Sequence, residues 1–323
     1  MQYSLLARFR GALLGSWLGE ILGGSTKNNS GVLWHRLHLK KVEISARQDE
    51  ITTPQETISN WSKIANSSIA SLISRGNLNR EDWLEVAEKE NPSLLLLKGK
   101  GKSHEVAIAN LPIALFFHDN PVTLSEKLEE SGKIWLSDME DIEGLDSIAF
   151  AIALILTENF NPTTLIPQIL TKLKSPQTPL AQLLEQVQTL LEQRADLETT
   201  VIQLRQGHQH KQKNCPNTTI ALAFYCFLYH PEDFRLTVTR ALRSGYQPQI
   251  TAAIAGALSG AYNSMMGIPV GWRVAAQRIS LWQNRQQLAS RLFALWSGVW
   301  DVNDIEEMNL AAVAGVGIIQ SRL

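Results

Sequence analysis

Cysteine is scarce in this sequence, with Cys215 and Cys226 the only two among 323 residues. Neither thiol belongs to a C-x-x-C pair, and two thiols do not make a disulfide framework. The sequence therefore excludes a small domain stapled by disulfides. The scarcity fits a reducing compartment, so we expect a cytoplasmic protein.

An excess of charge of either sign is also missing. Thirty Lys and Arg residues stand against thirty-one Asp and Glu residues, which gives a net charge of -1. This balance supplies no electrostatic reason to bind nucleic acid or an anionic membrane, and we expect neither as a partner. With 44% hydrophobic and 19% charged residues, the composition is that of an ordinary globular protein.

The sequence has no convincing membrane-spanning or leader segment. No charged residue lies between Arg243 and Arg273, and this run is long enough to span a bilayer. It consists mainly of small and polar residues with an internal proline, so a buried helix of a globular protein is the better interpretation. Near the N-terminus, Arg8 and Arg10 precede an apolar run as in a signal peptide, but Glu20 interrupts that run.

The uncharged run contains a stripe of small residues, here called the central stripe, formed by Ala252, Gly256 and Gly260. Their spacing of four places all three on one face of an α-helix. Glycine inside a helix costs about 0.5–1 kcal/mol relative to alanine, so close approach of another element must offset the loss. The polar segment 245–249 precedes this helix, and a loop at a helix N-terminus is a natural ligand site.

A second stripe occurs in residues 4–24, where Gly11, Gly15, Gly19 and Gly23 also recur at every fourth position. We call it the N-terminal stripe. Each stripe would leave its helix backbone poorly packed if it stood alone. We therefore expect the two stripes to pack directly against each other.

Most of the remaining apolar segments keep helical spacing, and no run of paired strands is present. The sequence predicts one all-α domain over residues 1–323, a compact bundle of about a dozen helices. We expect a loop over 25–54 and helices at 54–76, 79–90, 146–158, 220–228 and 234–243, with a second helix within 121–160 and one long amphipathic helix that includes 183–204.

Two segments resemble a known family. The run TAAIAGALSGAY with its GIPVGW ending is similar to the C-terminal signature of the ADP-ribosylglycohydrolases, which include the dinitrogenase reductase-activating glycohydrolases. The run RFRGALLGSWLGEILGG resembles the family's opening GALLGxxxGDALG. The resemblance touches four segments in the family's order over nearly the whole chain. It implies an all-α bundle that uses two magnesium- or manganese-class ions to remove an ADP-ribosyl modification.

The C-terminal signature departs from the family where the metal would bind. The family reads GGDxDT, and this chain reads GYQPQI. In this register the two metal-binding aspartates become Gln247 and Gln249, and the adjacent threonine becomes Ile250. At the N-terminal segment, Glu20 occupies the family's aspartate position, and Lys27 stands about where members carry a functional glutamate. Glu20 is either an acid in the pocket or a helix-end carboxylate bound to backbone.

A second metal motif of the family, TDDT, opens the helix that ends at Arg75 and Gly76 in this chain. A gapped register over 52–57 keeps one carboxylate, whereas an ungapped count keeps none. The ungapped count places the motif at Ser59, Asn60, Trp61 and Ser62. Because tryptophan cannot act as an oxygen ligand, this register lacks both aspartates of the motif.

The segment 103–112 resembles the family's GNGALMRVAPL, which wraps the ligand. It keeps the proline and loses both the Gly-Asn-Gly run and the arginine. His104 and Glu105 are therefore candidates for a changed pocket, with a loop surface as the alternative.

Other residues of metal-ligating type lack the spacing of a site. We expect each of these groups to be a solvated loop or face instead. They are His35 with His38; the acidic run Asp138, Glu140, Asp141, Glu143 and Asp146; and His208 and His210 near Cys215.

Three functional interpretations remain open. Replacing the aspartates removes roughly four negative charges from the site, enough to abolish affinity for magnesium or manganese, so we expect no cofactor and assign no catalytic residue. The first interpretation is a pseudoenzyme that binds an ADP-ribose-like or nucleotide ligand or acts as a regulator. The second is a hydrolase with an altered or metal-free site that uses Glu20, His104 or Glu105. The third is a helical scaffold that binds a protein partner.

Overall fold

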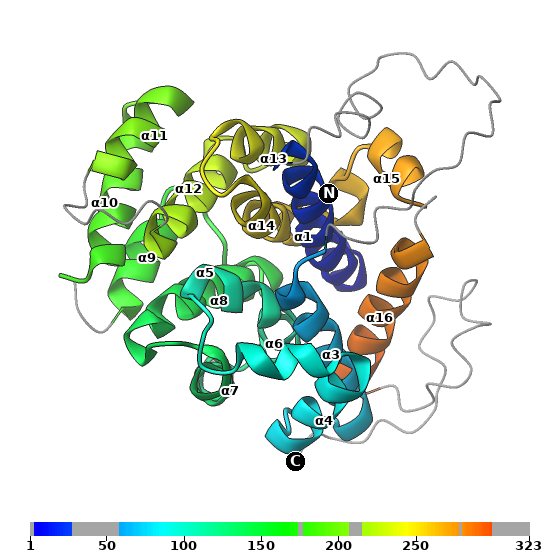
Figure 1. The fold of residues 1–323 in the computed structure, drawn as a ribbon. Coiled ribbons are helices and arrows are strands. Elements are labelled where there is room, and N and C mark those ends of the chain that lie inside the picture. Colours follow the sequence, from blue (N-terminus) through cyan, green and yellow to red (C-terminus); the bar gives the residue numbers. More distant parts are fainter. Residues whose placement is uncertain (1–2, 28–57, 174–176, 207–214, 278–279, 299–323) are drawn as a thin grey trace.

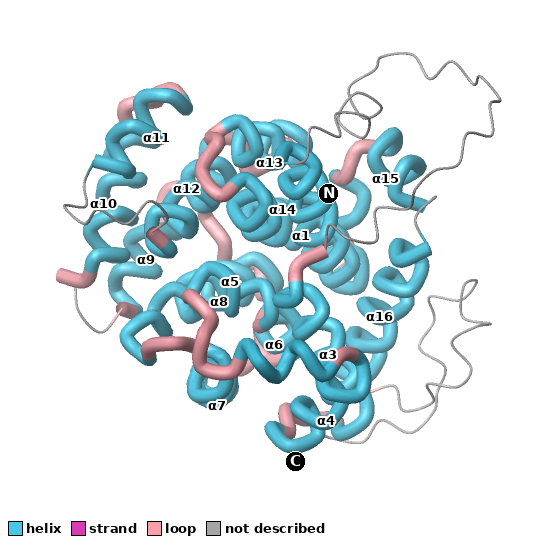
Figure 2. Tube along the Cα trace, viewed as in Figure 1, coloured by secondary structure: helices cyan, strands magenta, loops and turns pink. Residues whose placement is uncertain are grey.

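Helices build the part of the chain that the computed structural model describes, which is residues 3–27, 58–173, 177–206, 215–277 and 280–298. Within these ranges there is no strand, only an isolated bridge between Gly101 and Leu136 (Figure 2). The predicted all-α fold is therefore confirmed. None of the helices in these ranges has the length and apolarity needed to cross a bilayer.

The chain forms more helices than the dozen or so expected, because caps and prolines divide several apolar segments into short pieces. Two of the pieces are 3-10 helices, labelled η. In chain order the elements are α1 (Leu5–Lys27), α3 (Asn60–Arg75), α4 (Arg80–Glu90), η1 (Pro92–Leu97), α5 (Ser103–Ala109), α6 (Leu111–Phe116), α7 (Pro121–Trp135), η2 (Met139–Asp141), α8 (Ile142–Leu156), α9 (Leu165–Lys172), α10 (Pro179–Glu192), α11 (Leu197–Gln206), α12 (Pro216–Tyr229), α13 (Phe234–Arg243), α14 (Pro248–Gly267), α15 (Val270–Gln277) and α16 (Ser280–Trp296).

The two glycine stripes meet at the centre of the molecule, as the sequence predicts. Helices α1 and α14 lie side by side in Figure 1 and run antiparallel, because Gly11 faces Gly260 while Gly19 faces Ala252. A Cβ atom added to Gly15 would lie 2.2 Å from the carbonyl oxygen of Gly256. The two backbones therefore touch without intervening side chains, which accounts for glycine inside both helices.

Helix α14 is interrupted near its C-terminal end at Ser264, whose backbone has φ 60° and ψ -178°. A non-glycine residue in this region is strained. The N–H of Met266 donates to the Ser264 hydroxyl at 3.1 Å, and a Cβ added to Gly11 would lie 2.5 Å from the Ser264 carbonyl carbon. The break thus occurs where the start of α1 crosses α14.

The other helices surround this central pair. Helices α12, α13 and α8 pack against α14, and α16 packs against α1, α3 and α6. On the side away from α16, α10 and α11 form an outer layer next to α12 (Figure 1). The largest fully buried side chains include Trp17, Trp83, Trp135, Tyr225 and Phe9.

The prediction of one long amphipathic helix that includes 183–204 is wrong, because the structure divides this segment into α10 and α11. Arg194 adopts a left-handed φ of 51° between them. Asp196 then caps α11, with its carboxylate accepting the Thr199 N–H at 2.7 Å. A local cap overrides an apolar spacing that continues through the break.

The helix expected from residue 54 begins at Asn60 because the Ser59 hydroxyl accepts the Ser62 N–H at 3.3 Å and caps it. Asn79 caps α4. A loop is predicted over 25–54, but its first residues belong to α1, which continues to Lys27. Residues 28–54 lie outside the described ranges.

We expect Gly256→Leu to lower the free energy of unfolding by at least ~1–3 kcal/mol, because its side chain would be forced into backbone. A Cβ at this position would already lie 2.3 Å from the carbonyl oxygen of Gly15. Urea denaturation measures the change. Gly271→Ala in α15 is the control: no atom lies within 4 Å of its added Cβ, and a gain of about 0.5–1 kcal/mol is expected there. Unchanged stability of Gly256→Leu would contradict this contact.

Candidate functional site

Helix α1 delivers Glu20 to the N-terminus of α3, where its side chain is 1% exposed. The backbone N–H of Ser59 donates to one carboxylate oxygen at 2.6 Å, and the Ser62 hydroxyl donates to the other. Free N–H groups and the positive end of the helix dipole favour a carboxylate at this point. Of the two interpretations of Glu20, the contacts are those of a helix-end carboxylate bound to backbone.

The Glu20 carboxylate has a cation within electrostatic reach. Arg285 of α16 is 8% exposed, and its guanidinium lies over the ring of Trp17 at 5.6 Å. Trp17 is three residues before Glu20 on α1, which places both on the same side of that helix. Burial raises the pKa of Glu20, while the hydrogen bonds from Ser59 and Ser62 and the charge of Arg285 lower it. Burial lowers the pKa of Arg285 to about 10, and the Glu20 charge opposes this.

A second contact joins α5 to the N-terminus of α14. Nε2 of His104 lies 3.0 Å from the amide oxygen of Gln247. Because that oxygen only accepts, this orientation puts the imidazole proton on Nε2, and Nδ1 is left as a buried acceptor with no hydrogen bond among the described residues. Burial lowers the pKa of His104 to about 4; the charge of Lys102 lowers it further, and the Gln247 contact opposes. The imidazole is neutral at neutral pH.

The loop before α14 is held in place by its neighbours. Gln247 adopts a left-handed backbone, φ 41° and ψ 55°, and its carbonyl accepts the N–H groups of Ile250 and Thr251, each at 3.0 Å. The Thr251 hydroxyl donates to the Tyr246 carbonyl at 2.7 Å, and the Tyr246 hydroxyl accepts the Cys215 N–H at 2.6 Å. A strained, well-supported backbone of this kind is typical of ligand sites.

The ungapped register matches Asn60 and Trp61 to the aspartates of the second metal motif, and the structure places these two side chains in different surroundings. Trp61 is 7% exposed and meets Trp135 edge to face, with ring centroids 6.3 Å apart. Asn60 is exposed, and its side-chain oxygen accepts a long hydrogen bond, 3.4 Å, from the Lys63 ammonium. The structure thus places one of these positions in the aromatic core and the other on the surface.

Three further candidates make structural contacts. The Glu105 carboxylate accepts the Lys102 N–H at 3.0 Å and closes the first turn of α5. The backbone of Gln249 lies against Gly23, whose added Cβ would be 2.3 Å from the Gln249 Cα. Ile250 packs against the hydrophobic core. Glu20 is therefore the one carboxylate among the ten candidate residues that is not committed to its own helix.

This donor set does not fit a pair of hard divalent cations, which need several anionic oxygens. Both oxygens of Glu20 already accept hydrogen bonds, and Trp61 supplies none. No group of three or more His, Cys, Asp or Glu side chains with metal-binding geometry occurs among the described residues. In the acidic run, Asp138 caps η2 by accepting the Glu140 N–H at 3.0 Å. His35, His38, His208, His210 and the side chain of Lys27 lie outside the described ranges.

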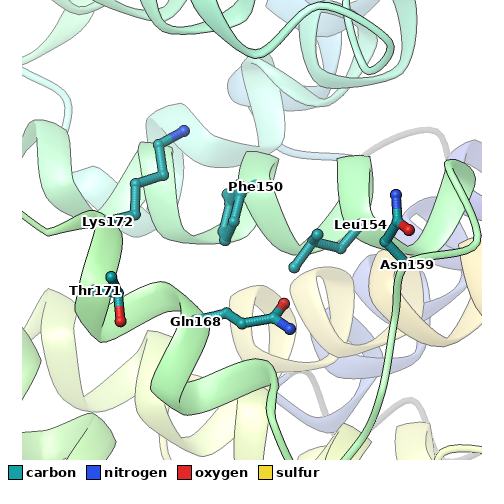
Figure 3. Close-up of a pocket in the computed structure, with 6 residues that line it drawn as sticks. All are labelled: Phe150, Leu154, Asn159, Gln168, Thr171 and Lys172. Carbon is teal, nitrogen blue, oxygen red and sulfur yellow. The ribbon is translucent and has the colours of Figure 1, made fainter.

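An open hollow of about 570 Å³ lies between α8 and α9, away from these contacts (Figure 3). Phe150 forms part of its apolar side, and the Lys172 ammonium lies 4.7 Å from the Phe150 ring centroid. None of the candidate site residues contributes to it. It is lined by Phe150, Leu154, Asn159, Gln168, Thr171 and Lys172.

The family assignment rests on a match over nearly the whole chain: a family model described as ADP-ribosylglycohydrolase matches residues 1–301. This chain belongs to the ADP-ribosylglycohydrolase family. A solved structure described as an "ADP-ribosylglycohydrolase-related protein complex" is similar, with a TM-score of 0.61 and 16% identity over 90% of this chain and 99% of that chain. At that identity the likeness shows the fold alone. No curated protein matches the chain significantly.

Arg285 is not among the residues that the sequence marked as candidates. Arg285 falls on the same helical face as Ala289 and Leu292, both fully buried. An arginine on an otherwise apolar stripe is the signal that would have marked it as a buried charge with a partner on another helix.

We expect the protonation of His104 to lower the free energy of unfolding of this protein in mild acid. The pKa of His104 in the folded protein, about 4, lies below the roughly 6.5 of an unfolded histidine. The unfolded state therefore binds more protons between these values, and stability falls as pH drops through that window, by roughly 2 kcal/mol between pH 7 and pH 5.

Urea denaturation at several pH values measures this effect. His104→Gln removes the titrating group, so the stability of the variant should fall less steeply than that of the wild type over the same range. Parallel curves for the two proteins would show that His104 is protonated as readily in the folded state as in the unfolded one.

Proposed function

We propose that this family member does not cleave ADP-ribose linkages by a metal-dependent route and acts instead as a ligand-binding or regulatory protein. The observation that carries the proposal is the engagement of Glu20. Its two carboxylate oxygens accept from the Ser59 N–H and the Ser62 hydroxyl. A metal ion would have to compete with both contacts for a carboxylate whose residue is 1% exposed.

The remaining candidate positions support the same conclusion. Gln247 contributes a neutral amide whose oxygen accepts from His104 at 3.0 Å, and Trp61 packs against Trp135. A neutral amide adds no charge, and an aromatic ring adds no hard ligand. Two hard divalent cations held here would lack the anionic oxygens that balance their charge.

The contacts weigh against a metal-free hydrolase as well. A general base needs a pKa near the working pH and reach to a substrate proton. The pKa of His104 is about 4, and the Glu105 carboxylate is used within its own helical turn. Glu20, the third candidate, is enclosed by α1 and α3. Ligand binding without turnover is therefore favoured.

The N-terminus of α14 is the part of the site that best suits a ligand. Gln247 caps this helix without a side-chain bond to its backbone. Beside it, Nδ1 of His104 is a buried acceptor without a partner. A polar ligand that offers a donor to Nδ1 and an anionic group to the helix end would satisfy both. An ADP-ribose-like or nucleotide molecule has groups of both kinds.

The metal half of the proposal is tested by calorimetric titration with magnesium and with manganese, beside a de-ADP-ribosylation assay in their presence. We expect no micromolar binding and no turnover that a chelator abolishes. A metal-dependent ADP-ribosylglycohydrolase run in parallel is the positive control. Tight binding, or turnover lost on adding chelator, would falsify the proposal.

The ligand half is tested by thermal shift with ADP-ribose and with ADP, each with and without magnesium. We expect a ligand to raise Tm by the same amount in both conditions, because no metal takes part. Gln247→Ala should reduce that shift, since it removes the His104 contact at the end of α14. Asn60→Ala, at an exposed position on α3, is the matched control and should leave the shift unchanged. A shift that needs magnesium would contradict the mechanism of binding.

A further inference from the structure

A buried carboxylate is costly unless a positive charge balances it. Glu20 is 1% exposed, and its two hydrogen-bond donors among the described residues, the Ser59 N–H and the Ser62 hydroxyl, are neutral. These donors give each carboxylate oxygen one hydrogen bond but leave the negative charge unbalanced. A cation must therefore lie nearby if Glu20 is ionised.

Arg285 is placed to be that cation. Its charge lowers the pKa of Glu20, and the charge of Glu20 raises the pKa of Arg285; no other charged side chain among the described residues affects either pKa. The guanidinium rests on Trp17, one turn before Glu20 on α1. The sequence holds no Asp or Glu between Asp233 and Asp301, so neither α16 nor its neighbours α14 and α15 can supply another partner.

The charge pair also spans three helices. Glu20 comes from α1, its donors from the start of α3, and Arg285 from α16, which packs against both. A hydrogen-bonded contact also joins α16 to α1, where the Arg10 guanidinium donates to the Ser290 hydroxyl through Nε at 3.0 Å and Nη2 at 2.8 Å. This contact is only partly buried, whereas Arg285 is 8% exposed.

We propose that Arg285 is the built-in counter-cation of Glu20, and that the pair closes the α1–α3 half of the site and fastens α16 over it. The N-terminus of α3 then already holds its anion, and that anion already holds its cation. This half of the site accepts neither a phosphate group nor a metal ion. The absence of metal is taken from the proposed function, but the coupling of the two charges is measured separately, so either can fail alone.

A double-mutant cycle measures the coupling. Arg285→Met leaves the Glu20 charge buried without a partner, and we expect Tm to fall by roughly 5–10 °C. Glu20→Gln should also lower Tm, while the double variant should recover most of the loss because both charges are gone. Arg285→Lys keeps the charge and should lose less than Arg285→Met. Arg291→Met, at an exposed position on the same helix, is the control and should leave Tm unchanged.

A titration of Glu20 separates a charge effect from mere packing. With Arg285→Met, the apparent pKa of Glu20 followed by carboxyl carbon NMR should rise further, since a nearby positive charge lowers it. A loss of packing alone would leave this pKa in place. Additive losses in the cycle, or an unchanged Glu20 pKa, would overturn the proposal.

Chemical rescue covers the case in which the larger truncation weakens the fold. Arg285→Ala opens space for a free cation of the same shape, and millimolar methylguanidinium should raise the Tm of this variant. Sodium chloride at equal ionic strength should not, and neither salt should help Arg291→Ala. Equal effects of methylguanidinium and sodium chloride would show that no guanidinium site exists beside Glu20.

Discussion

Direct contact between the backbones of α1 and α14 sets the geometry on which the candidate site depends. Two helices that carry side chains at their crossing sit 8–10 Å apart, whereas glycine allows a closer approach. A Cβ on Gly19 would lie 2.0 Å from the Ala252 carbonyl oxygen. This contact fixes α1 along the axis of α14, and so fixes the position of Glu20 on α1 relative to Gln247 at the start of α14.

From that central pair the site divides into two halves with different chemistry. One half is ionic and closed: Glu20 lies against the N-terminus of α3, and Arg285 lies across Trp17. The other half is neutral and unsaturated: the His104 imidazole meets the Gln247 amide and keeps one ring nitrogen without a partner. In the first half the Glu20 carboxylate is shielded from solvent, since the residue is 1% exposed. In the second half, Nδ1 of His104 can still accept a hydrogen bond from a ligand.

The fold was predictable because its main signals are local and periodic. Glycine at every fourth position fixes the helix face and, since bare backbone needs a close neighbour, the helix partner as well. Single capping side chains were harder to weigh. Asp196 ends an apolar periodicity that otherwise continues from Leu183 to Leu204, and nothing in the spacing itself marks the break.

The candidate site was less predictable because its contacts join residues far apart in the sequence. Glu20 was recognised by its motif, but its cation lies on the last described helix. Trp61 was assigned to the pocket by its register in a family motif, whereas its size places it beside Trp135. A motif fixes where the backbone passes; the volume of the side chain decides whether it enters the pocket or the core.

The same central crossing has a consequence for how the chain is made. Gly15 leaves the ribosome long before Gly256, and at 5–20 residues per second the delay is roughly 10–50 s. During that interval the glycine face of α1 has no native partner, because α14 has not yet been made. The glycine face of α1 therefore stays uncovered during most of synthesis, although α1 belongs to the central helix pair of the folded protein.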